Sequence, residues 1–482
     1  FSQAELQAVV QPFLNRPLSF ADLLQARAAV TQLYLDKGYV TSGAYLPANQ
    51  IVKNGIVTIS IVEGSVEDIR ITGLKSLQPS YLRDRLKAAT QAPLNINRLN
   101  DALQRLKQDP LLSRLSAEVL PGTKTGSNIL AVSAVQSPSR ELRVFLNNQR
   151  SAASGEFARQ VSFQQTNLTR YGDILNASYT NTDGSHEVGV SYALPINPQN
   201  GTLSIRYGQS FSKVVQKPFD ALNLRSTSRN VTLQWRQPVL DRMNHQLAVG
   251  VAIGRQESET TFLSGFPFSI PESGADAKGR IRITQLNLFQ EWTQRDQKSL
   301  LALRSDFGLG LDLGATDNRR APDGQFLKWQ GQAQWIRALT PRTTLTLQST
   351  LQVADRPLPN PAVLDLGGID GLRGYPQDVF LFDQAVLTSA ALEFSLLPST
   401  ANDHGLYFGP FIDVGYGWNL RKASPTQDRV LVSPGLGLRY EWSDRIGLQI
   451  NWGIPIVRLR NEQISPGFAD SRVLFSLEAK LF

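Results

Sequence analysis

Apolar and polar residues alternate with a period of two along most of the chain, from about residue 142 to its end. The pattern is clearest over residues 231–235, 345–353 and 446–452. Such alternation predicts β-strands with one apolar and one polar face. Soluble β-sandwiches show it too, but about 340 residues of strand and turn without a helical pattern exceed one sandwich, whereas a membrane barrel leaves no strand edge unpaired. At about 20–22 residues per strand and connection, residues 137–482 are predicted to form a transmembrane antiparallel β-barrel of about 16 strands, so the fold is mainly β.

The first 136 residues carry a helical pattern instead, and this pattern occurs twice. Ser19 in the first copy and Asn95 in the second are each followed by apolar residues after four, seven and eleven positions. Ser and Asn cap helix N-termini, and this spacing places the apolar residues on one face of a helix. Each copy closes with a predicted strand, at residues 57–62 and 129–135. The repeat therefore predicts two small α+β modules.

The expected module boundaries are residues 1–64 and 65–136. The second module opens with a strand at residues 66–71, for which the first has no counterpart. The repeat thus predicts that the initial strand of the first module precedes Phe1. The short closing strands present unpaired backbone groups, to which an extended segment of another protein can add as a strand. The candidate partner-binding residues are Val57, Ile59, Ile61, Ile129, Ala131 and Ser133.

One glycine-rich stretch, residues 366–382, interrupts the alternating region. Its sequence LGGIDGLRGYPQDVFLF carries a single arginine, Arg373, between glycines. Glycine allows backbone conformations and close approaches that other residues do not, so the stretch predicts a structured loop, which we expect to fold inward over residues 356–385. The rigid guanidinium fork suits anchorage to a carboxylate. The alternative is a solvated arginine in an ordinary surface turn.

Composition narrows the possible functions. The net charge of +8 is spread along the chain without basic runs, which gives no nucleic-acid footprint. The absence of cysteine excludes disulfides and thiolate metal sites, and the three histidines are far apart, so we expect no metal, no cofactor and no enzyme activity. No apolar run of 18 residues occurs, which excludes a transmembrane helix but not a barrel.

Two segments of the first module resemble a known domain type. Residues 35–50, LDKGYVTSGAYLPANQ, and residues 56–64, IVTISIVEG, resemble POTRA domains of two-partner secretion transporters in the outer membrane. Residues 167–175, NLTRYGDIL, likewise resemble an early barrel turn of these transporters. These are the haemolysin and haemagglutinin secretion-activation proteins of the POTRA-plus-barrel superfamily. The resemblance implies an outer-membrane barrel with both modules in the periplasm.

Two signatures of that superfamily occur in the barrel region. The first is the loop-tip motif LRGY, and the second is a strand motif of phenylalanine, aspartate and glycine at alternate positions. In family members the loop arginine docks on the inward face of that strand, so the resemblance implies an ion pair between Arg373 and Asp413. The motif residues are Leu372, Arg373, Gly374 and Tyr375 in the loop and Phe411, Asp413 and Gly415 in the strand.

The resemblance implies a pore that captures an exported, unfolded partner protein and passes it to the cell surface or the medium. Its other expected contacts are outer-membrane lipid and, during biogenesis, the barrel-assembly machinery. One alternative is a barrel-assembly insertase, which usually carries more POTRA modules. Another is a passive diffusion porin, which needs no modules, and the sequence offers no constellation for an outer-membrane hydrolase.

Overall fold

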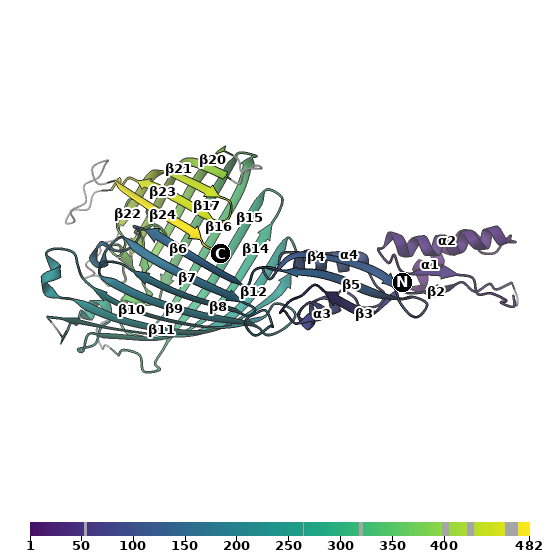
Figure 1. Ribbon diagram of the computed structural model, residues 1–482, viewed down its shortest axis with the longest axis horizontal. Coiled ribbons are helices and arrows are strands. Elements are labelled where there is room, and N and C mark those ends of the chain that lie inside the picture. Colours follow the sequence, from purple (N-terminus) through teal and green to yellow (C-terminus); the bar gives the residue numbers. More distant parts are fainter. Residues whose placement is uncertain (53–54, 264, 318–321, 398–403, 422–428, 458–470) are drawn as a thin grey trace. The chain divides into compact units, whose positions relative to one another are not determined.

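The computed structural model describes residues 1–52, 55–263, 265–317, 322–397, 404–421, 429–457 and 471–482 (Figure 1). The chain divides into two compact units. The first unit comprises Phe1–Pro138 together with Thr169–Gly172, and the second comprises Ser139–Leu168 and Asp173–Phe482. Among the described residues, no helix is both long and apolar enough to cross a membrane.

The first module of unit 1 has two helices and a short two-stranded sheet. Ser19 caps its longer helix: the Ser19 Oγ accepts a hydrogen bond from the Asp22 N–H at 3.2 Å, and Asp22 accepts one from the Ser19 N–H at 2.8 Å. The helix ends before Gly38, which has a positive φ of 86°. The elements are α1 (Gln3–Val10), the 3₁₀ turn η1 (Gln11–Phe13), α2 (Phe20–Asp36), β1 (Gly43–Tyr45) and β2 (Ser60–Val62).

The second module packs two helices on a three-stranded sheet. The predicted cap holds, because the Asn95 side chain accepts hydrogen bonds from the N–H groups of Asn97 and Arg98. Apolar side chains of both helices and of the sheet form one core, in which Leu82, Leu86 and Leu130 are fully buried. The elements are β3 (Ser65–Thr72), α3 (Pro79–Lys87), α4 (Ile96–Lys107), β4 (Leu112–Pro121) and β5 (Ser127–Gln136).

Two expectations about the closing strands were wrong. Strand β2 covers only residues 60–62 of the predicted 57–62, because the Gln50 side chain bonds the backbone N–H and C=O of Thr58 in place of a neighbouring strand. Strand β5 was expected to have a free edge, but the sheet order is β3-β5-β4, so β5 pairs on both sides. The free edges of that sheet belong to β3 and β4.

Sixteen strands form a closed antiparallel barrel, as the strand arithmetic predicted (Figure 1). Closure comes from pairing between the last strand and the first, with Lys480 opposite Arg143. The two-residue strand β13 (Phe266–Pro267) adds only to the end of β12. In chain order the barrel strands are β6 (Arg140–Asn147), β7 (Ala158–Thr166), β8 (Ile174–Asn181), β9 (Ser185–Pro195), β10 (Thr202–Lys213), β11 (Arg225–Asp241), β12 (His245–Phe262), β14 (Arg280–Arg295), β15 (Ser299–Leu311), β16 (Leu327–Thr340), β17 (Thr343–Ala354), β20 (Gln384–Leu397), β21 (His404–Trp418), β22 (Arg429–Trp442), β23 (Ile446–Gly453) and β24 (Arg472–Lys480).

Because apolar and polar residues alternate along the strands, apolar side chains lie on the outer face of the barrel and polar side chains lie in its lumen. Val231, Leu233 and Trp235 on β11 are 42%, 44% and 38% exposed on the outside, whereas Glu291 and Arg304 pair with each other on the inside. Consecutive strands are antiparallel, so their connections alternate between the two ends of the barrel. The connections at one end are short turns, such as residues 242–244 and 296–298, and we call this end the turn end. The connections at the other end, which we call the loop end, are longer and include residues 263–279, 312–326 and 355–383.

Candidate functional site

The connection between β17 and β20 folds back on itself as a compact hairpin. Its strands β18 (Leu364–Asp365) and β19 (Leu381–Phe382) pair with each other, and a tight turn closes the tip. In this turn the Leu372 N–H donates to the Leu366 carbonyl at 2.7 Å, and the Tyr375 N–H donates to the Leu372 carbonyl at 2.9 Å. The tip is therefore held by its own backbone hydrogen bonds and presents Arg373 in one position.

The glycines of the tip are needed for two different reasons. Gly368 has a φ of +87°, a conformation that favours glycine. Gly367 and Gly371 instead allow close approach, since a Cβ there would lie 1.9 Å from the Pro376 carbonyl oxygen and 2.3 Å from the Leu366 carbonyl oxygen. Of the glycines of the tip, only Gly368 adopts a positive φ.

Strand β21 supplies the carboxylate that receives the arginine. Phe411, Asp413 and Gly415 lie on its buried face, whereas Ile412 and Val414 between them are 45% and 38% exposed on the outside. The buried face is thus the lumen, and Asp413 is 0% exposed. Gly415 leaves room for the loop, because a Cβ there would lie 3.0 Å from a methyl carbon of Leu372.

Arg373 lies in the lumen and donates three hydrogen bonds to Asp413. Its Nε lies 2.9 Å from Asp413 Oδ2, its Nη2 lies 2.6 Å from Oδ1, and its backbone N–H donates to Oδ2 at 3.1 Å. The guanidinium carbon also lies 3.3 Å from the centre of the Phe411 ring. The Arg373 side chain is only 13% exposed. A bidentate pair between shielded groups is the geometry in which an arginine fork is most selective.

Three further side chains that sequence reasoning missed complete the site. Ser389 on β20 donates to Asp413 Oδ1 at 2.8 Å and accepts from Arg373 Nη2 at 3.0 Å. Ser433 on β22 accepts the Gly374 N–H at 2.8 Å, and Asn451 on β23 lies 3.5 Å from Arg373 Nη1. Both serines stand directly opposite Asp413 in the register. These two serines can be recognised only from the pairing of the strands, because small polar residues occur throughout the lumen face.

The remaining tip residues anchor the loop to the loop end of the wall. The Tyr375 hydroxyl donates to the Val432 carbonyl at 3.2 Å and accepts the Val457 N–H at 3.1 Å. Gly453 on β23 lets the tip approach, because a Cβ there would lie 2.5 Å from the Gly374 nitrogen. Apolar packing surrounds these contacts in a cluster whose fully buried members are Leu366, Leu372, Tyr375, Phe380, Phe382, Ala385 and Leu431.

The base of the loop is closed by a second carboxylate. Asp383 accepts the N–H groups of Leu358 at 2.7 Å and Leu420 at 3.0 Å, so it joins both ends of the loop to the end of β21. The Gln352 amide donates to the carbonyls of Ala362 and Asp383, both at 3.2 Å. Tip and base are therefore held by separate sets of hydrogen bonds.

A cavity of about 450 Å³ lies beside the docked tip. Its wall carries uncharged polar side chains from β17, among them Thr346, Gln348 and Thr350. Among the charged side chains of the wall, Arg439 contacts Glu393 at 2.9 Å and Arg373 contacts Asp413, while Asp370 adds a further carboxylate. The wall of this cavity therefore carries uncharged polar side chains and charges of both signs.

The candidate partner-binding residues of the modules are divided between two settings. Val57 and Ile59 precede β2, and only Ile61 lies within it, opposite Ala44 of β1. Among the described residues of unit 1, each of these two strands pairs only with the other and so has one free edge. Ile129, Ala131 and Ser133 lie on the central strand β5 and have no free backbone edge, for the reason given above.

The segment at residues 167–175 forms the turn between β7 and β8. Its residues Thr169–Gly172 belong to unit 1, where the Arg170 carbonyl accepts the Gln78 N–H at 2.9 Å and Arg170 Nε donates to the Ser76 carbonyl at 3.0 Å. Among the residues that the structure describes, no group of three or more His, Asp or Glu side chains is arranged to hold a metal ion.

Comparisons with known proteins identify both parts of the chain. Residues 1–64 match the family model of the ShlB-type POTRA domain, and residues 126–440 match that of the haemolysin secretion/activation protein ShlB/FhaC/HecB. The outer membrane transporter CdiB of Escherichia coli is 23% identical over 390 residues, covering 78% of this chain and 63% of CdiB. The match thus spans slightly less than two thirds of that relative's length.

A second relative matches over more of its length. The heme/hemopexin transporter protein HuxB of Haemophilus influenzae strain 86-028NP is 20% identical over 478 residues, covering 94% of this chain and 80% of HuxB. The solved structure of CdiB from Escherichia coli superposes with a TM-score of 0.76 at 18% identity, covering 100% of this chain and 88% of that one, which establishes a common fold. With more than half of its residues matched by one family model, the chain belongs to the haemolysin secretion/activation family ShlB/FhaC/HecB, the outer-membrane transporters of two-partner secretion.

Proposed function

We propose that the chain captures an exported, unfolded partner protein in the periplasm and passes it through the barrel to the cell surface or the medium. The observation that carries this proposal is the joining of two α+β modules, of which the first matches the POTRA model, to a barrel of the secretion family. Members of this family are transporters and not enzymes. The barrel lies in the outer membrane and the POTRA modules lie in the periplasm, so the loop end of the barrel faces the cell exterior.

The docked loop is the element that gates the lumen in this proposal. In the structure Arg373 and its neighbours occupy the lumen against β20–β23, so the loop must move, or the chain must pass beside it, during transport. The cavity beside the tip supports the second route for an extended segment. Threonine and glutamine side chains on its wall offer hydrogen bonds to any passing backbone without holding a particular sequence.

The modules supply the capture step. The short sheet of β1 and β2 has free edges, and backbone pairing with an extended segment gives affinity that tolerates many side chains. The exposed apolar residues Ile51, Val52 and Ile56 adjoin this sheet in sequence and would add selectivity. The central strand β5 does not serve this purpose, so the candidate set from sequence is reduced to Ile61 and its neighbours.

Two other functions fit the observations less well. A porin gains nothing from two modules that precede the barrel. A barrel-assembly insertase shares the general architecture, but the model that matches residues 126–440 is that of the secretion family. We further propose contacts with outer-membrane lipid and, during biogenesis, with the barrel-assembly machinery. Transport needs no cofactor here, and folding of the partner outside the cell would drive it.

Site-specific crosslinking tests the capture step. Because the chain has no cysteine, a photoreactive label can be placed at a single introduced cysteine, Ile61→Cys on β2 or Ala131→Cys on the central strand β5. Exported proteins encoded by genes that neighbour the gene of this chain are to be tested as partners, each held unfolded. We expect adducts from position 61 and few from position 131. Equal labelling at both positions, or none at either, would contradict strand addition at β2.

A further inference from the structure

The outer face of β11, β12 and β14 changes from apolar to charged towards the loop end. Residues that stand opposite one another in the register form rows across these three strands. Within a barrel wall, such a change marks the boundary between lipid acyl chains and headgroups, here in the outer leaflet. From the middle of the strands outward the rows are Trp235–Val251–Leu288, Leu233–Ile253–Leu286, Val231–Arg255–Thr284 and Arg229–Glu257–Arg282.

An open groove of about 440 Å³ lies across this boundary. Its lining is almost wholly apolar and comes from three strands and from the connection that follows β15. The lining residues are Val231, Leu233, Ile253, Gly254, Arg255, Thr284 and Leu313. A hydrocarbon chain matches this lining, since the groove opens on the lipid side and no described part of the barrel covers it.

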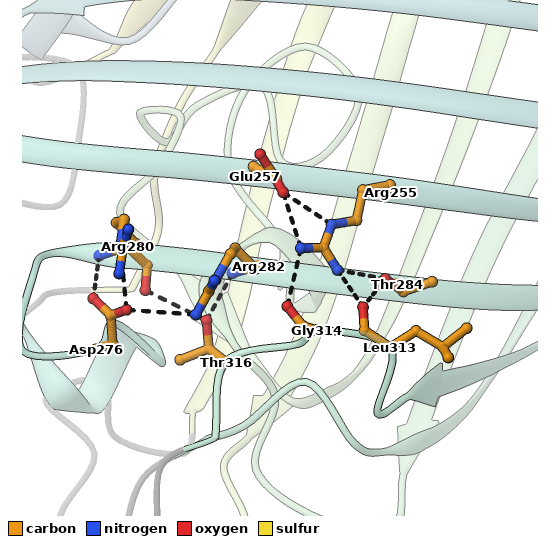
Figure 2. Close-up of polar contacts among 9 residues, drawn as sticks. All are labelled: Arg255, Glu257, Asp276, Arg280, Arg282, Thr284, Leu313, Gly314 and Thr316. Carbon is orange, nitrogen blue, oxygen red and sulfur yellow. Dashed lines mark hydrogen bonds and ion pairs between the residues drawn. The ribbon is translucent and has the colours of Figure 1, made fainter.

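Arg255, which lines the groove, is held by contacts to two strands and to the connection that follows β15 (Figure 2). Its Nη1 donates to Thr284 Oγ1 at 2.7 Å and to the Leu313 carbonyl at 2.5 Å, and its Nη2 donates to the Gly314 carbonyl at 2.9 Å. Glu257 takes the remaining donors, at 3.0 Å from Nε and 2.9 Å from Nη2. All five donors of Arg255 are thus occupied, and the residue holds Leu313 in place over the groove.

Two neighbouring arginines keep donors available. The Arg229 side chain is exposed and, within the described residues, forms no hydrogen bond or ion pair. The Arg282 side chain is 34% exposed, but its Nε is buried without a partner, so a ligand reaches only the Nη end of this guanidinium. The carboxylate nearest to Arg282 is Asp276, whose Oδ2 lies 3.8 Å from Nη2 and also receives Arg280 Nε at 3.4 Å (Figure 2). Glu257 stands opposite both Arg229 and Arg282 in the register, but it is bonded to Arg255.

The charges of this rim favour an anion. On the outward faces of the three strands the acidic groups are Glu257 and Glu259, and the basic groups are Arg229, Arg255, Arg280 and Arg282. The adjoining connections include Asp276, Asp312, Asp317 and Lys278. On the strands themselves, positive charge is therefore in excess next to an apolar groove. A soluble phosphate would leave the groove unused, and an uncharged lipid would leave the guanidinium donors unpaired.

We propose that this face binds a phosphorylated acyl lipid of the outer leaflet, of the lipid A kind. One acyl chain occupies the groove between Leu233, Ile253 and Leu313. A phosphate of the headgroup binds Arg229 and Arg282 at the same time. Glu257 stands between these two arginines in the register. Guanidinium groups bind phosphate oxygens through paired hydrogen bonds, which a lysine or an amide cannot reproduce.

Lipid binding by the full chain in detergent tests this proposal. The probe is bis-phosphorylated, hexa-acylated lipid A, and the readout is the dissociation constant from native mass spectrometry or fluorescence titration. We expect the double variant Arg229→Gln with Arg282→Gln to bind at least about tenfold more weakly. Arg242→Gln is the matched control, because Arg242 is exposed in the turn of the same hairpin at the opposite membrane boundary, and it should bind normally.

Two companion measurements separate the proposal from loss of structure and from general charge attraction. Leu313→Asn alters the groove without changing charge and should also weaken binding, while heat-modifiable migration on gels reports that each barrel is folded. Dephosphorylated lipid A and phosphatidylglycerol should bind several-fold more weakly than the probe. Equal binding of phosphatidylglycerol, an equal loss in Arg242→Gln, or unchanged binding in the double variant would overturn the proposal.

Discussion

The ion pair between Arg373 and Asp413 differs in burial from the other ion pairs of the lumen. The two side chains are 13% and 0% exposed, whereas those of Arg236 and Glu291 are 25% and 26% exposed. Removing one partner of a buried pair costs about 3–5 kcal/mol, whereas an exposed pair contributes about 0–1 kcal/mol. A single substitution at the buried pair should therefore change the position of the loop, and a substitution at the exposed pair should not.

The first prediction concerns Asp413→Asn. The amide keeps the shape of the carboxylate but loses its charge, so the docked state of the loop is weakened and Arg373 leaves the lumen more often. We expect trypsin, added from the loop side of proteoliposomes, to cut after Arg373 at least about tenfold faster than in the unaltered protein. Barrel insertion should be unchanged. The control is Glu291→Gln, and equal cleavage of both variants would show that the pair does not hold the loop.

The second prediction is a pH dependence at the start of α2. Hydrogen bonds from the Ser19 side chain and backbone, followed by that from Arg16, lower the pKa of Asp22 to about 2. A carboxylate with a lowered pKa stabilises the folded state above its unfolded pKa, near 3.9, and this contribution is lost as the pH falls towards 2. We expect faster hydrogen exchange in residues 19–27, after correction for the intrinsic rate, between pH 4 and pH 2. An Asp22→Asn variant with the same pH profile would contradict this cause.

Sequence reasoning found the two charged residues of the site but not their neutral partners. The motifs of the loop and of β21 named Arg373 and Asp413 because the types and spacing of their residues are distinctive. Ser389, Ser433 and Asn451 come from three other strands, and nothing local distinguishes them from the many polar residues of the lumen. Their selection depends on the register between strands, which a single sequence does not state.

At the scale of elements, the tip of the loop fits β23 only because Gly453 has no side chain. The tip backbone passes so close that a Cβ at Gly453 would lie 2.5 Å from the Gly374 nitrogen and 2.7 Å from the Arg373 carbonyl carbon. Gly447, on the same strand, has no atom within 4 Å of such a Cβ. One strand thus offers a position that should be sensitive to a methyl group and one that should not.

The third prediction follows from this pair of glycines. Gly453→Ala should displace the tip while leaving both members of the ion pair in place, because backbone atoms, unlike flexible side chains, cannot move aside cheaply. We expect faster cleavage after Arg373 and more frequent open events in planar bilayers. Gly447→Ala should behave like the unaltered protein. A docked, protected loop in Gly453→Ala would show that the tip has more freedom than its close contacts indicate.

Element types were predicted better than element neighbours. The caps at Ser19 and Asn95 and the alternation of the barrel strands are local signals, and the corresponding helices and strands are present. The predictions about the closing strands of the modules were wrong because they concerned neighbours. Thr58 bonds the Gln50 side chain in place of a strand, and β5 is central in its sheet. Pairing partners are set by tertiary packing and leave no mark in the strand's own sequence.

At the scale of the whole molecule, the change of period near residue 140 and the strand arithmetic predicted the two kinds of unit and the closed 16-stranded barrel. Length sufficed for this, since about 340 residues at about 20–22 per strand and connection correspond to about 16 strands. The identity of the transported partner does not follow in the same way, because pairing through backbone groups tolerates many sequences. Function at this scale therefore needs a transport measurement.

The most direct test is transport by the purified chain in liposomes, with a candidate exported partner protein supplied unfolded on the side of the two modules. We expect the partner to cross the membrane without any nucleotide, so that it becomes protected from protease added on the side of the modules, and we expect Asp413→Asn to alter the rate. Efficient insertion of unrelated barrel proteins without translocation of a partner would contradict transport and favour the insertase.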